Sequence, residues 1–320
     1  RIREVRIMAK ATREAYGEAL KKLAANNPDV VVLDADLSGS TKTSEFKKIS
    51  PERFFNVGIA EQDLIGTAAG MAIAGKIPFA SSFAMFAVGR AYEIIRNTVA
   101  YPKLNVKIAA THAGLTVGED GASHQAIEDI SLMRGIPNMT VINPADSIEA
   151  EQAVLKAAEI KGPVYIRLGR MAVEDVYDTD YKFQLGKGVE LKKGNDLTII
   201  ATGIMVQEAL KAAKKLSEEG IDARVINIHT IKPIDKEIII TAAKETGAIV
   251  TAEEHSIIGG LGSAVLEVLS DVYPVPVKRI GVLDTFGESG KPSDLLKKYH
   301  LTEEDIQGAC REAIKLKERI

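Results

Sequence analysis

The sequence has little of what marks several classes of protein. Its single cysteine, Cys310, cannot form an internal disulfide, which favours a reducing compartment such as the cytoplasm. Its 41 basic and 44 acidic residues give a net charge of −3 without a basic tract, so we expect no binding to nucleic acid. Tryptophan is absent and aromatic residues make up only 5%, so a Phe or Tyr beside a motif is worth attention.

A long hydrophobic run is also missing. The least charged stretch, residues 66–88, has Lys76 as its only charge, but Lys76-Ile77-Pro78 interrupts it and most of its residues are small. It therefore favours a helix followed by a strand, both packed inside protein, over a membrane span. The first ten residues are charged and contain no apolar core of a signal peptide. We expect a cytoplasmic protein that does not bind membranes.

Several catalytic and binding motifs are absent too. The chain has no GxxxxGK[ST] loop and no HExxH helix, and Cys310 lies in a charged segment without a nearby histidine. These absences exclude a P-loop enzyme, a zincin and a cysteine nucleophile. Gly259-Gly260-Leu261-Gly262 lacks the spacing of a dinucleotide fingerprint, so we interpret it as a turn where a helix packs closely on a sheet.

Strand-like and helical segments alternate along all 320 residues, which is typical of an α/β protein with parallel sheets and about two domains. In the first half we predict strands at 30–33, 77–82, 106–110, 139–142 and 164–168, and helices at 12–25, 61–74, 86–100, 124–134 and 147–161. In the second half we predict strands at 197–201, 223–228, 248–251 and 277–280, and helices at 206–219, 235–245, 261–272 and 303–317. The polar segment 173–194 is predicted to link a domain at 1–172 to a smaller domain at 195–320.

Polar and aromatic residues gather where the predicted strands of the first domain end. In open parallel sheets, ligands bind beyond the carboxyl ends of the strands. The residues at or after these ends are Asp34, Asp36, Phe83, Phe86, His112, Arg167 and Arg170. Each alone is compatible with a capping or solvated group, but their shared position predicts a site.

Glu61 is the most distinctive single residue. Helical spacing stacks it with Ile65, Ala68 and Ala72 on a small apolar face. Its carboxylate either stabilises the N-terminus of the helix or, if it is buried, requires a proton donor or a cation. A protonatable nitrogen of a heterocycle would meet that requirement.

The loop from Thr111 to Gln125 combines His112, Asp120 and His124 with three glycines. Glycines let a backbone approach a ligand closely, and the three polar side chains suit hydrogen bonding to a polyol and proton transfer. A zinc site is a competing interpretation, although zinc ligands are usually more closely spaced. The remaining interpretation is a surface loop without a binding function.

Four motifs, in order, resemble the C-terminal section of transketolase. They are RFFNVGIAEQ at 53–62, SSFAMF at 81–86, THAGLTVGEDGASHQ at 111–125 and IPNMTV at 136–141. The resemblance covers essentially the whole chain. It implies a pyrimidine-binding domain of the thiamine diphosphate fold followed by the small transketolase C-terminal domain. It also implies an enzyme of the pentose phosphate pathway that transfers a two-carbon ketol unit from a ketose phosphate to an aldose phosphate.

The resemblance further implies roles for residues of the cofactor site. Glu61 matches the carboxylate that bonds to N1′ of the thiamine diphosphate pyrimidine and promotes loss of the thiazolium C2 proton. Phe86, with Phe83 beside it, matches the aromatic wall that stacks on this pyrimidine. Asp36 matches an acid near the thiazolium.

The substrate site is implied in the same way. His112 and Asp120 match residues that contact sugar hydroxyls, and His124 matches a position near cofactor and substrate, so Glu61, His112 and His124 are the implied catalytic residues. The groups that hold the sugar phosphate in the family match Arg13, Ser40 and Arg170. Arg167 is the alternative to Arg170 for this role.

Two departures from the family pattern have consequences. Gly89 stands where many full-length transketolases carry a Tyr. The Gly-Asp-Gly motif followed some thirty residues later by Asn, which binds Mg²⁺ and the diphosphate, is not recognisable. We therefore predict no metal ligand here, and an N-terminal transketolase subunit that holds Mg²⁺ in an α2β2 assembly.

Three alternatives remain open. Deoxyxylulose-phosphate synthase typically begins the matching loop with Asp-Arg, where this chain has Thr111-His112. The beta subunit of a 2-oxoacid dehydrogenase lacks the Gly118-Glu119-Asp120-Gly121 pattern. A non-catalytic subunit that kept the fold would have no need of Glu61 and His112.

Overall fold

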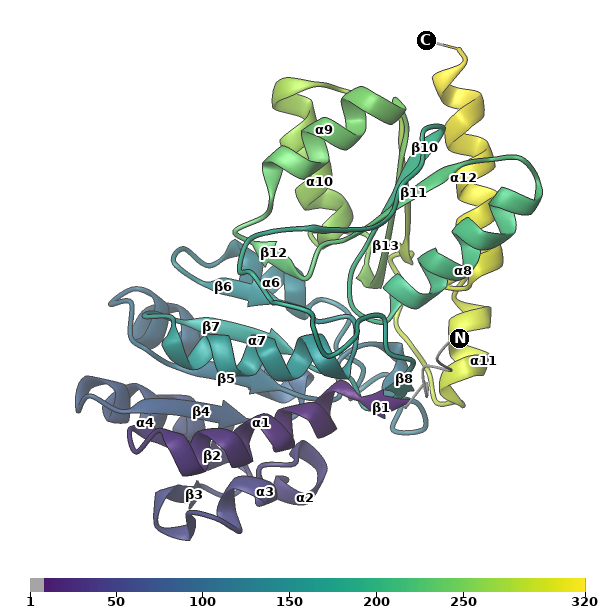
Figure 1. Cartoon of the computed structure of the whole chain (residues 1–320). Coiled ribbons are helices and arrows are strands. Elements are labelled where there is room, and N and C mark those ends of the chain that lie inside the picture. The colour runs from purple at the N-terminus through teal and green to yellow at the C-terminus, as the bar shows by residue number, and fades with distance from the viewer. Residues whose placement is uncertain (1–8, 320) are drawn as a thin grey trace.

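Two parallel sheets organise the chain, one in each half (Figure 1). The computed structural model describes residues 9–319. The strands of the first sheet are β2 (Val30–Asp34), β3 (Phe54–Asn56), β4 (Ile77–Ser81), β5 (Lys107–Ala110), β6 (Thr140–Ile142), β7 (Val164–Arg167) and β12 (Thr230–Lys232). Their order is β12-β6-β7-β5-β4-β2-β3, and only β12 runs antiparallel to its neighbour. Because β12 comes from the second half of the chain, both halves build this sheet.

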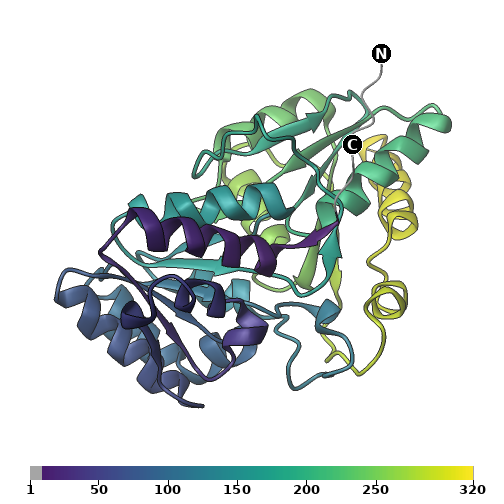
Figure 2. The ribbon, with the colours of Figure 1, turned by 60° about the horizontal axis from the view of Figure 1, so that its bottom comes forward.

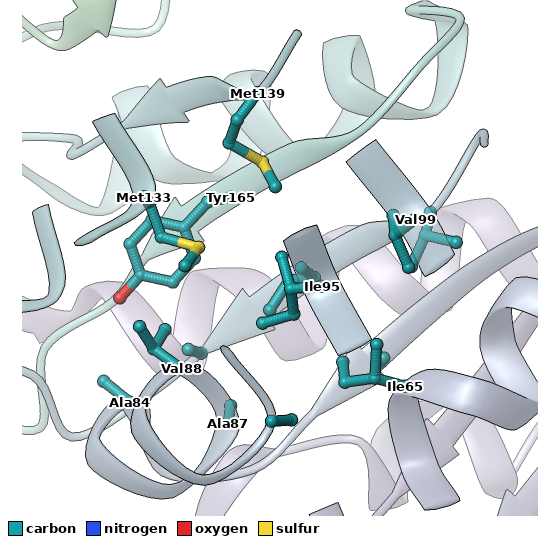
Figure 3. Close-up of a cluster of buried hydrophobic side chains, with 14 of the residues drawn as sticks. Ile65, Ala84, Ala87, Val88, Ile95, Val99, Met133, Met139 and Tyr165 are labelled. Carbon is teal, nitrogen blue, oxygen red and sulfur yellow. The ribbon is translucent and has the colours of Figure 1, made fainter. Parts of the chain in front are cut away.

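Helices cover both faces of the first sheet. On one face lie α1 (Thr12–Asn26) and α7 (Ser147–Glu159), against Val30 and Val32 of β2. On the other lie α4 (Glu61–Ile73), the π-helices η2 (Met85–Arg90) and η3 (Ile95–Ala100), the short α5 (Tyr92–Ile94) and α6 (Asp129–Gly135). This face packs on Val31 and Leu33, since successive residues of a strand point to opposite faces. Figure 3 shows part of this core, where Ile95 lies among Ile65, Val99 and Met139.

The second sheet is smaller and equally enclosed. Its strands are β9 (Val189–Lys192), β10 (Leu197–Ala201), β11 (Ala223–Asn227), β13 (Ile249–Ser256) and β14 (Val277–Val282), in the order β14-β13-β10-β11-β9 with only β9 antiparallel. Helices α8 (Met205–Glu218) and α12 (Glu303–Lys317) cover one face, and α9 (Lys236–Thr246) and α10 (Leu261–Val272) cover the other. The remaining elements are β1 (Lys10–Ala11), β8 (Ala172–Val173), α2 (Ser38–Thr41), α3 (Ser44–Lys47), α11 (Pro292–Lys298), and the 3-10 turns η1 (Pro51–Arg53) and η4 (Leu115–Val117).

The predicted α/β class is confirmed, and every predicted strand is present. The predicted helix at 124–134 is wrong at its start, because residues 124–128 belong to the loop and α6 begins at Asp129. The predicted helix at 86–100 is a succession of π, α and π turns. The segment 173–194 contains β9 of the second sheet, and the boundaries of the linker stay a prediction.

The turn at 259–262 packs α10 on the sheet, as predicted. Glu253 on β13 accepts hydrogen bonds from the backbone N–H groups of Leu261 at 2.7 Å and Gly262 at 2.8 Å. A Cβ at Gly260 would overlap the Glu253 carboxylate, so only glycine allows this close approach. Among residues 9–319, no helix is both long enough and apolar enough to span a membrane.

Candidate active site

Glu61 is the first residue of α4 and is only 2% exposed. Its Oε2 accepts a hydrogen bond from Nη1 of Arg90 at 3.1 Å. Within the described part of the chain, no hydrogen bond reaches Oε1 of Glu61, and this oxygen is not one of the fully enclosed polar atoms that lack a partner. Oε1 can therefore still be reached, and it is suited to accept a hydrogen bond from a donor outside the chain.

Arg90 was not predicted as a site residue. It ends η2, and its guanidinium carbon lies 5.4 Å from the centre of the Phe86 ring, within reach of a cation–π interaction. Arg90 therefore bridges the Glu61 carboxylate and the aromatic ring. The wide turn of a π-helix brings Arg90 and Phe86 to the same side, and such turns often occur at functional sites.

Phe83 and Phe86 lie between the carboxylate and the histidines. Their rings are stacked with centres 6.4 Å apart. Phe83 also stacks on His112 at 3.8 Å, and Phe86 meets the edge of His124 at 5.0 Å. The structure thus brings both predicted aromatic residues and both loop histidines into one cluster.

His112 is buried and has a left-handed backbone with φ of 58°. Its Nε2 lies 3.1 Å from Nη1 of Arg13, and its Nδ1 lies 2.9 Å from Oγ1 of Thr111. Because arginine only donates, Nε2 must accept, which places the ring proton on Nδ1. Burial, with the nearby Arg13 and Arg170, lowers the pKa of His112 to about 3. The imidazole is therefore neutral at physiological pH.

Arg13 connects His112 to the loop after β2. Its Nη1 also donates to the backbone oxygen of Ser40 at 3.0 Å. The buried Asp34 shapes this loop, since it accepts from the Thr41 hydroxyl at 2.6 Å and the Thr43 hydroxyl at 2.8 Å. The backbone N–H of Arg13 donates to the oxygen of Gly169 at 3.3 Å, so Arg13 lies beside the segment that carries Arg170, and burial followed by the charge of Arg170 lowers the pKa of Arg13.

Arg170 and Asp120 lie at the outer edge of the site. Nη1 of Arg170 donates to the backbone oxygen of Val117 at 2.7 Å and lies 3.6 Å from the carboxylate of Asp120. Both side chains are accessible to solvent, unlike His112. Asp36, also exposed and with φ of 64°, accepts a hydrogen bond from the Asn56 amide at 2.8 Å.

Arg167 does not join this cluster. It is buried, and its Nε donates to Asp129 at 2.8 Å while its Nη2 donates to the backbone oxygens of Ala126 at 3.2 Å and Glu254 at 2.9 Å. Its donors are engaged inside the protein, so Arg170 is the better placed of the two arginines to meet an anion.

The site therefore combines a buried carboxylate, an aromatic wall, a neutral imidazole and two close arginines. They lie beyond the carboxyl ends of β2, β4, β5 and β7, where a parallel sheet binds ligands. In the part of the chain that the structure describes, no group of three or more His, Cys, Asp or Glu residues is placed to hold a metal ion. The arrangement suits an aromatic heterocycle with a hydrogen-bonding nitrogen beside a polyhydroxylated anion.

Comparison with known proteins assigns both halves of the chain to one family. Residues 8–175 match the transketolase pyrimidine-binding domain, and residues 186–306 match the transketolase C-terminal domain. A transketolase C-terminal section of Methanocaldococcus jannaschii is 56% identical over 96% of this chain and 97% of its own length. A 6-deoxy-6-sulfo-D-fructose transketolase subunit of a Clostridium species is 44% identical and covers 98% of both chains. A solved structure described as a split gene transketolase, an inactive β4 tetramer, is 62% identical with a TM-score of 0.91, covering 96% of this chain and 99% of that one.

The fold and the site define the pyrimidine-binding half of a thiamine-dependent enzyme, joined to its C-terminal domain. The chain belongs to the transketolase family and corresponds to the C-terminal subunit of a split transketolase. Deoxyxylulose-phosphate synthase and the beta subunit of a 2-oxoacid dehydrogenase are not favoured by these comparisons.

Proposed function

We propose that the chain supplies the pyrimidine-binding and sugar-binding half of a transketolase active site. A second, N-terminal subunit completes the site by holding Mg²⁺ and the diphosphate, in an α2β2 assembly in the cytoplasm. The assembly transfers a two-carbon ketol unit from a ketose phosphate to an aldose phosphate, a reaction of the pentose phosphate pathway. The observation that carries the proposal is Glu61, buried with Oε1 unpaired beside the Phe86 wall.

The residues present fit the pyrimidine end of thiamine diphosphate. Oε1 of Glu61 is free to bond to a ring nitrogen, and the stacked Phe83 and Phe86 offer an apolar face to an aromatic ring. A flat heterocycle against these rings gains the stacking energy typical of aromatic pairs, about 1 kcal/mol beyond the burial of area. We place Asp36 near the thiazolium of the cofactor, because it follows β2 at the same edge of the sheet.

In this proposal Glu61 exchanges one proton with a nitrogen of the cofactor's pyrimidine ring. Arg90 fixes the carboxylate through Oε2, so that Oε1 shares its proton with N1′ of the pyrimidine. When bound, thiamine diphosphate supplies the nucleophilic carbon that accepts and passes on the two-carbon unit. The apolar residues Leu64 and Ile65 of the same helix lie in the core, so the Glu61 carboxylate has an apolar floor, and a partner subunit that covers the site would strengthen this hydrogen bond by excluding water.

The histidines and arginines handle the sugar. His112 is neutral, so its Nε2 can accept a hydrogen bond from a sugar hydroxyl in place of the one from Arg13, with Asp120 and His124 as further hydrogen-bonding groups. Arg13 and Arg170 are suited to a phosphate group, which would compete for Arg170 with the exposed carboxylates of Asp120 at 3.6 Å and Glu119 at 3.9 Å. Ser40 lies beside Arg13 on the phosphate side.

The exposed surface around Glu61 is suited to contact with a second subunit. α4 exposes Gly66, Gly70 and Ile73, of which Ile73 is 74% exposed, and Ile59 is exposed just before the helix. Nothing lies within 4 Å of a Cβ built at Gly66 or Gly70, so a partner could pack closely against this helix. The Mg²⁺ and diphosphate would then be held mainly by that partner.

The test is reconstitution. The chain is mixed with a transketolase N-terminal section that carries the Mg²⁺–diphosphate motif, and transfer from xylulose 5-phosphate to an aldose phosphate is followed by a coupled assay. We expect turnover only when chain, partner, Mg²⁺ and thiamine diphosphate are all present. Failure of the assembled complex with every phosphorylated and sulfonated ketose in a panel would exclude the proposed reaction.

A further inference from the structure

The loop Thr111–Gln125, which we call the substrate loop, is held by the second domain. Glu254 near the end of β13 is buried, and its Oε1 accepts a hydrogen bond from the backbone N–H of Thr116 at 2.6 Å. Thr116 lies between His112 and Asp120 in the sequence, the two residues assigned to the sugar hydroxyls. A carboxylate in one domain thus bonds to the middle of a loop in the other.

The three glycines of the substrate loop all face the second domain. Gly114 has φ of 83°, and a Cβ there would overlap the carboxylate of Glu254. Gly118 has φ of 85°, and its Cβ would lie 3.2 Å from the Pro292 ring. Gly121 has φ of 77°, and its Cβ would lie 2.5 Å from Oγ of Ser289. These glycines are needed for left-handed turns and for close contact between domains, so close approach to a ligand is not required to explain them.

The far end of the loop is fixed by the same domain. Nε2 of Gln125 donates to the backbone oxygen of Glu288 at 2.9 Å. Nη2 of Arg167 donates to the backbone oxygens of both Ala126 and Glu254. Arg167 therefore links Ala126, the residue after the loop, to β13. Figure 2 shows the blue-green loop lying beside the yellow segment that leads into α11.

We propose that Glu254 is a positioning residue, through which the second domain holds the substrate loop so that His112 and Asp120 face the sugar. This inference rests on the proposed function, because the sugar-binding site belongs to that proposed function. Glu254 does not touch the substrate; it acts through the backbone of Gly114–Thr116. The second domain therefore acts mainly on sugar binding, while Glu61 lies outside the substrate loop and is held by Arg90.

The decisive comparison is Glu254→Ala against Glu254→Gln, with Glu253→Ala as the matched control. Glu253 is the adjacent residue on β13 and equally buried, but it bonds to the start of α10 and not to the loop. The Glu254→Gln side chain keeps an oxygen that accepts from the Thr116 N–H, whereas Glu254→Ala removes the acceptor. We expect Glu254→Ala to speed hydrogen exchange in the 111–125 segment and to lower kcat/KM for the sugar donor roughly 10- to 100-fold, the cost of slight misplacement. Affinity for thiamine diphosphate should change much less than kcat/KM, because Glu61 lies outside the loop, and Glu254→Gln should restore the parental behaviour.

A second variant covers the case in which Glu254→Ala does not fold. Gly114→Ala leaves Glu254 in place but pushes against its carboxylate, and we expect the same faster exchange in the loop and the same loss in kcat/KM. The inference is wrong if exchange in the loop stays parental in both variants, or if Glu253→Ala changes it equally. Hydrogen exchange needs no turnover, so an inactive parental assembly would count against the proposed function and leave this result standing.

Discussion

Glu61, Arg13 and Arg170 each depend on a partner that lies far away in the sequence. Arg90 holds Glu61 across 29 residues, and His112 meets Arg13 across 99 residues. The types of the predicted site residues could be recognised from motifs, but their protonation states could not. The neutral His112 follows from burial and two arginines, which only the folded chain brings together. Arg90 belongs to none of the recognised motifs, and its position directly after Gly89 was the only feature of the sequence that could have pointed to it.

The first prediction concerns the proton on Glu61. Glu61→Gln keeps the shape and can still accept from Arg90, but it removes the proton that Oε1 shares. We expect the assembled enzyme to lose activity by about two to four orders of magnitude, the usual size of an acid–base contribution, while the thermal unfolding midpoint changes little. Glu304→Gln is the control, because Glu304 also lies in the first turn of a helix but is exposed. Near-parental turnover of Glu61→Gln at saturating cofactor would refute the assignment.

The second prediction separates phosphate binding from chemistry. Arg170 is accessible and is held by one hydrogen bond, to the backbone oxygen of Val117, so Arg170→Ala should fold normally. We expect KM for a ketose phosphate donor to rise about tenfold or more, since one charge-assisted hydrogen bond contributes roughly 1.5–3 kcal/mol. KM for hydroxypyruvate, which has no phosphate, should rise much less. Equal losses with both donors would show that Arg170 is structural.

Individual elements show where sequence patterns stop being informative. The apolar spacing of 124–134 predicted one helix, but a bridge between Ala113 and Ala126 closes the loop first, so α6 begins only at Asp129. β12 was missed because it has three residues and precedes Pro233, and it pairs with a strand from the other half of the chain. Arg167 was placed correctly at a strand end, but its pairing with Asp129 at 2.8 Å is a tertiary contact that spacing does not reveal.

The third prediction concerns strand β13 and pH. Burial raises the pKa of Glu254 from its ordinary 4.5 to about 7, against the opposing charge of Arg167. Between these values the unfolded chain releases the proton and the folded chain keeps it, so the stability contributed by Glu254 is full below pH 4.5 and is lost as the pH rises to 7. The unfolding midpoint of the parental chain should therefore fall relative to that of Glu254→Gln as the pH rises from 4.5 to 7, and the difference should stay constant above pH 7.

Burial lowers the pKa of His255 to about 4, so its contribution to stability increases as the pH rises. Because His255 is present in both chains, this contribution cancels in the difference between their unfolding midpoints. Thermal unfolding followed by circular dichroism at several pH values is sufficient. A difference that stays constant over the whole range would show that folding does not raise the pKa of Glu254.

The molecule as a whole presents half of a cofactor site on an open surface. In the proposed function Glu61 and Phe86 bind the pyrimidine, and α4 beside them exposes glycines and Ile73. The diphosphate of the cofactor carries negative charge and needs Mg²⁺ with oxygen ligands. The motif that supplies these ligands in the family is not recognisable in this chain, so we propose that the whole site depends on two polypeptides.

Calorimetry with thiamine diphosphate and Mg²⁺ tests this dependence most directly. The chain is titrated alone and after mixing with an N-terminal section that carries the Mg²⁺–diphosphate motif, with Glu61→Gln as a variant that should weaken binding in the mixture. We expect weak or no heat of binding with the chain alone, and saturable binding together with ketol transfer once the partner is present. Tight binding of the cofactor and full transfer by the pure 320-residue chain would contradict the division of the site between two subunits.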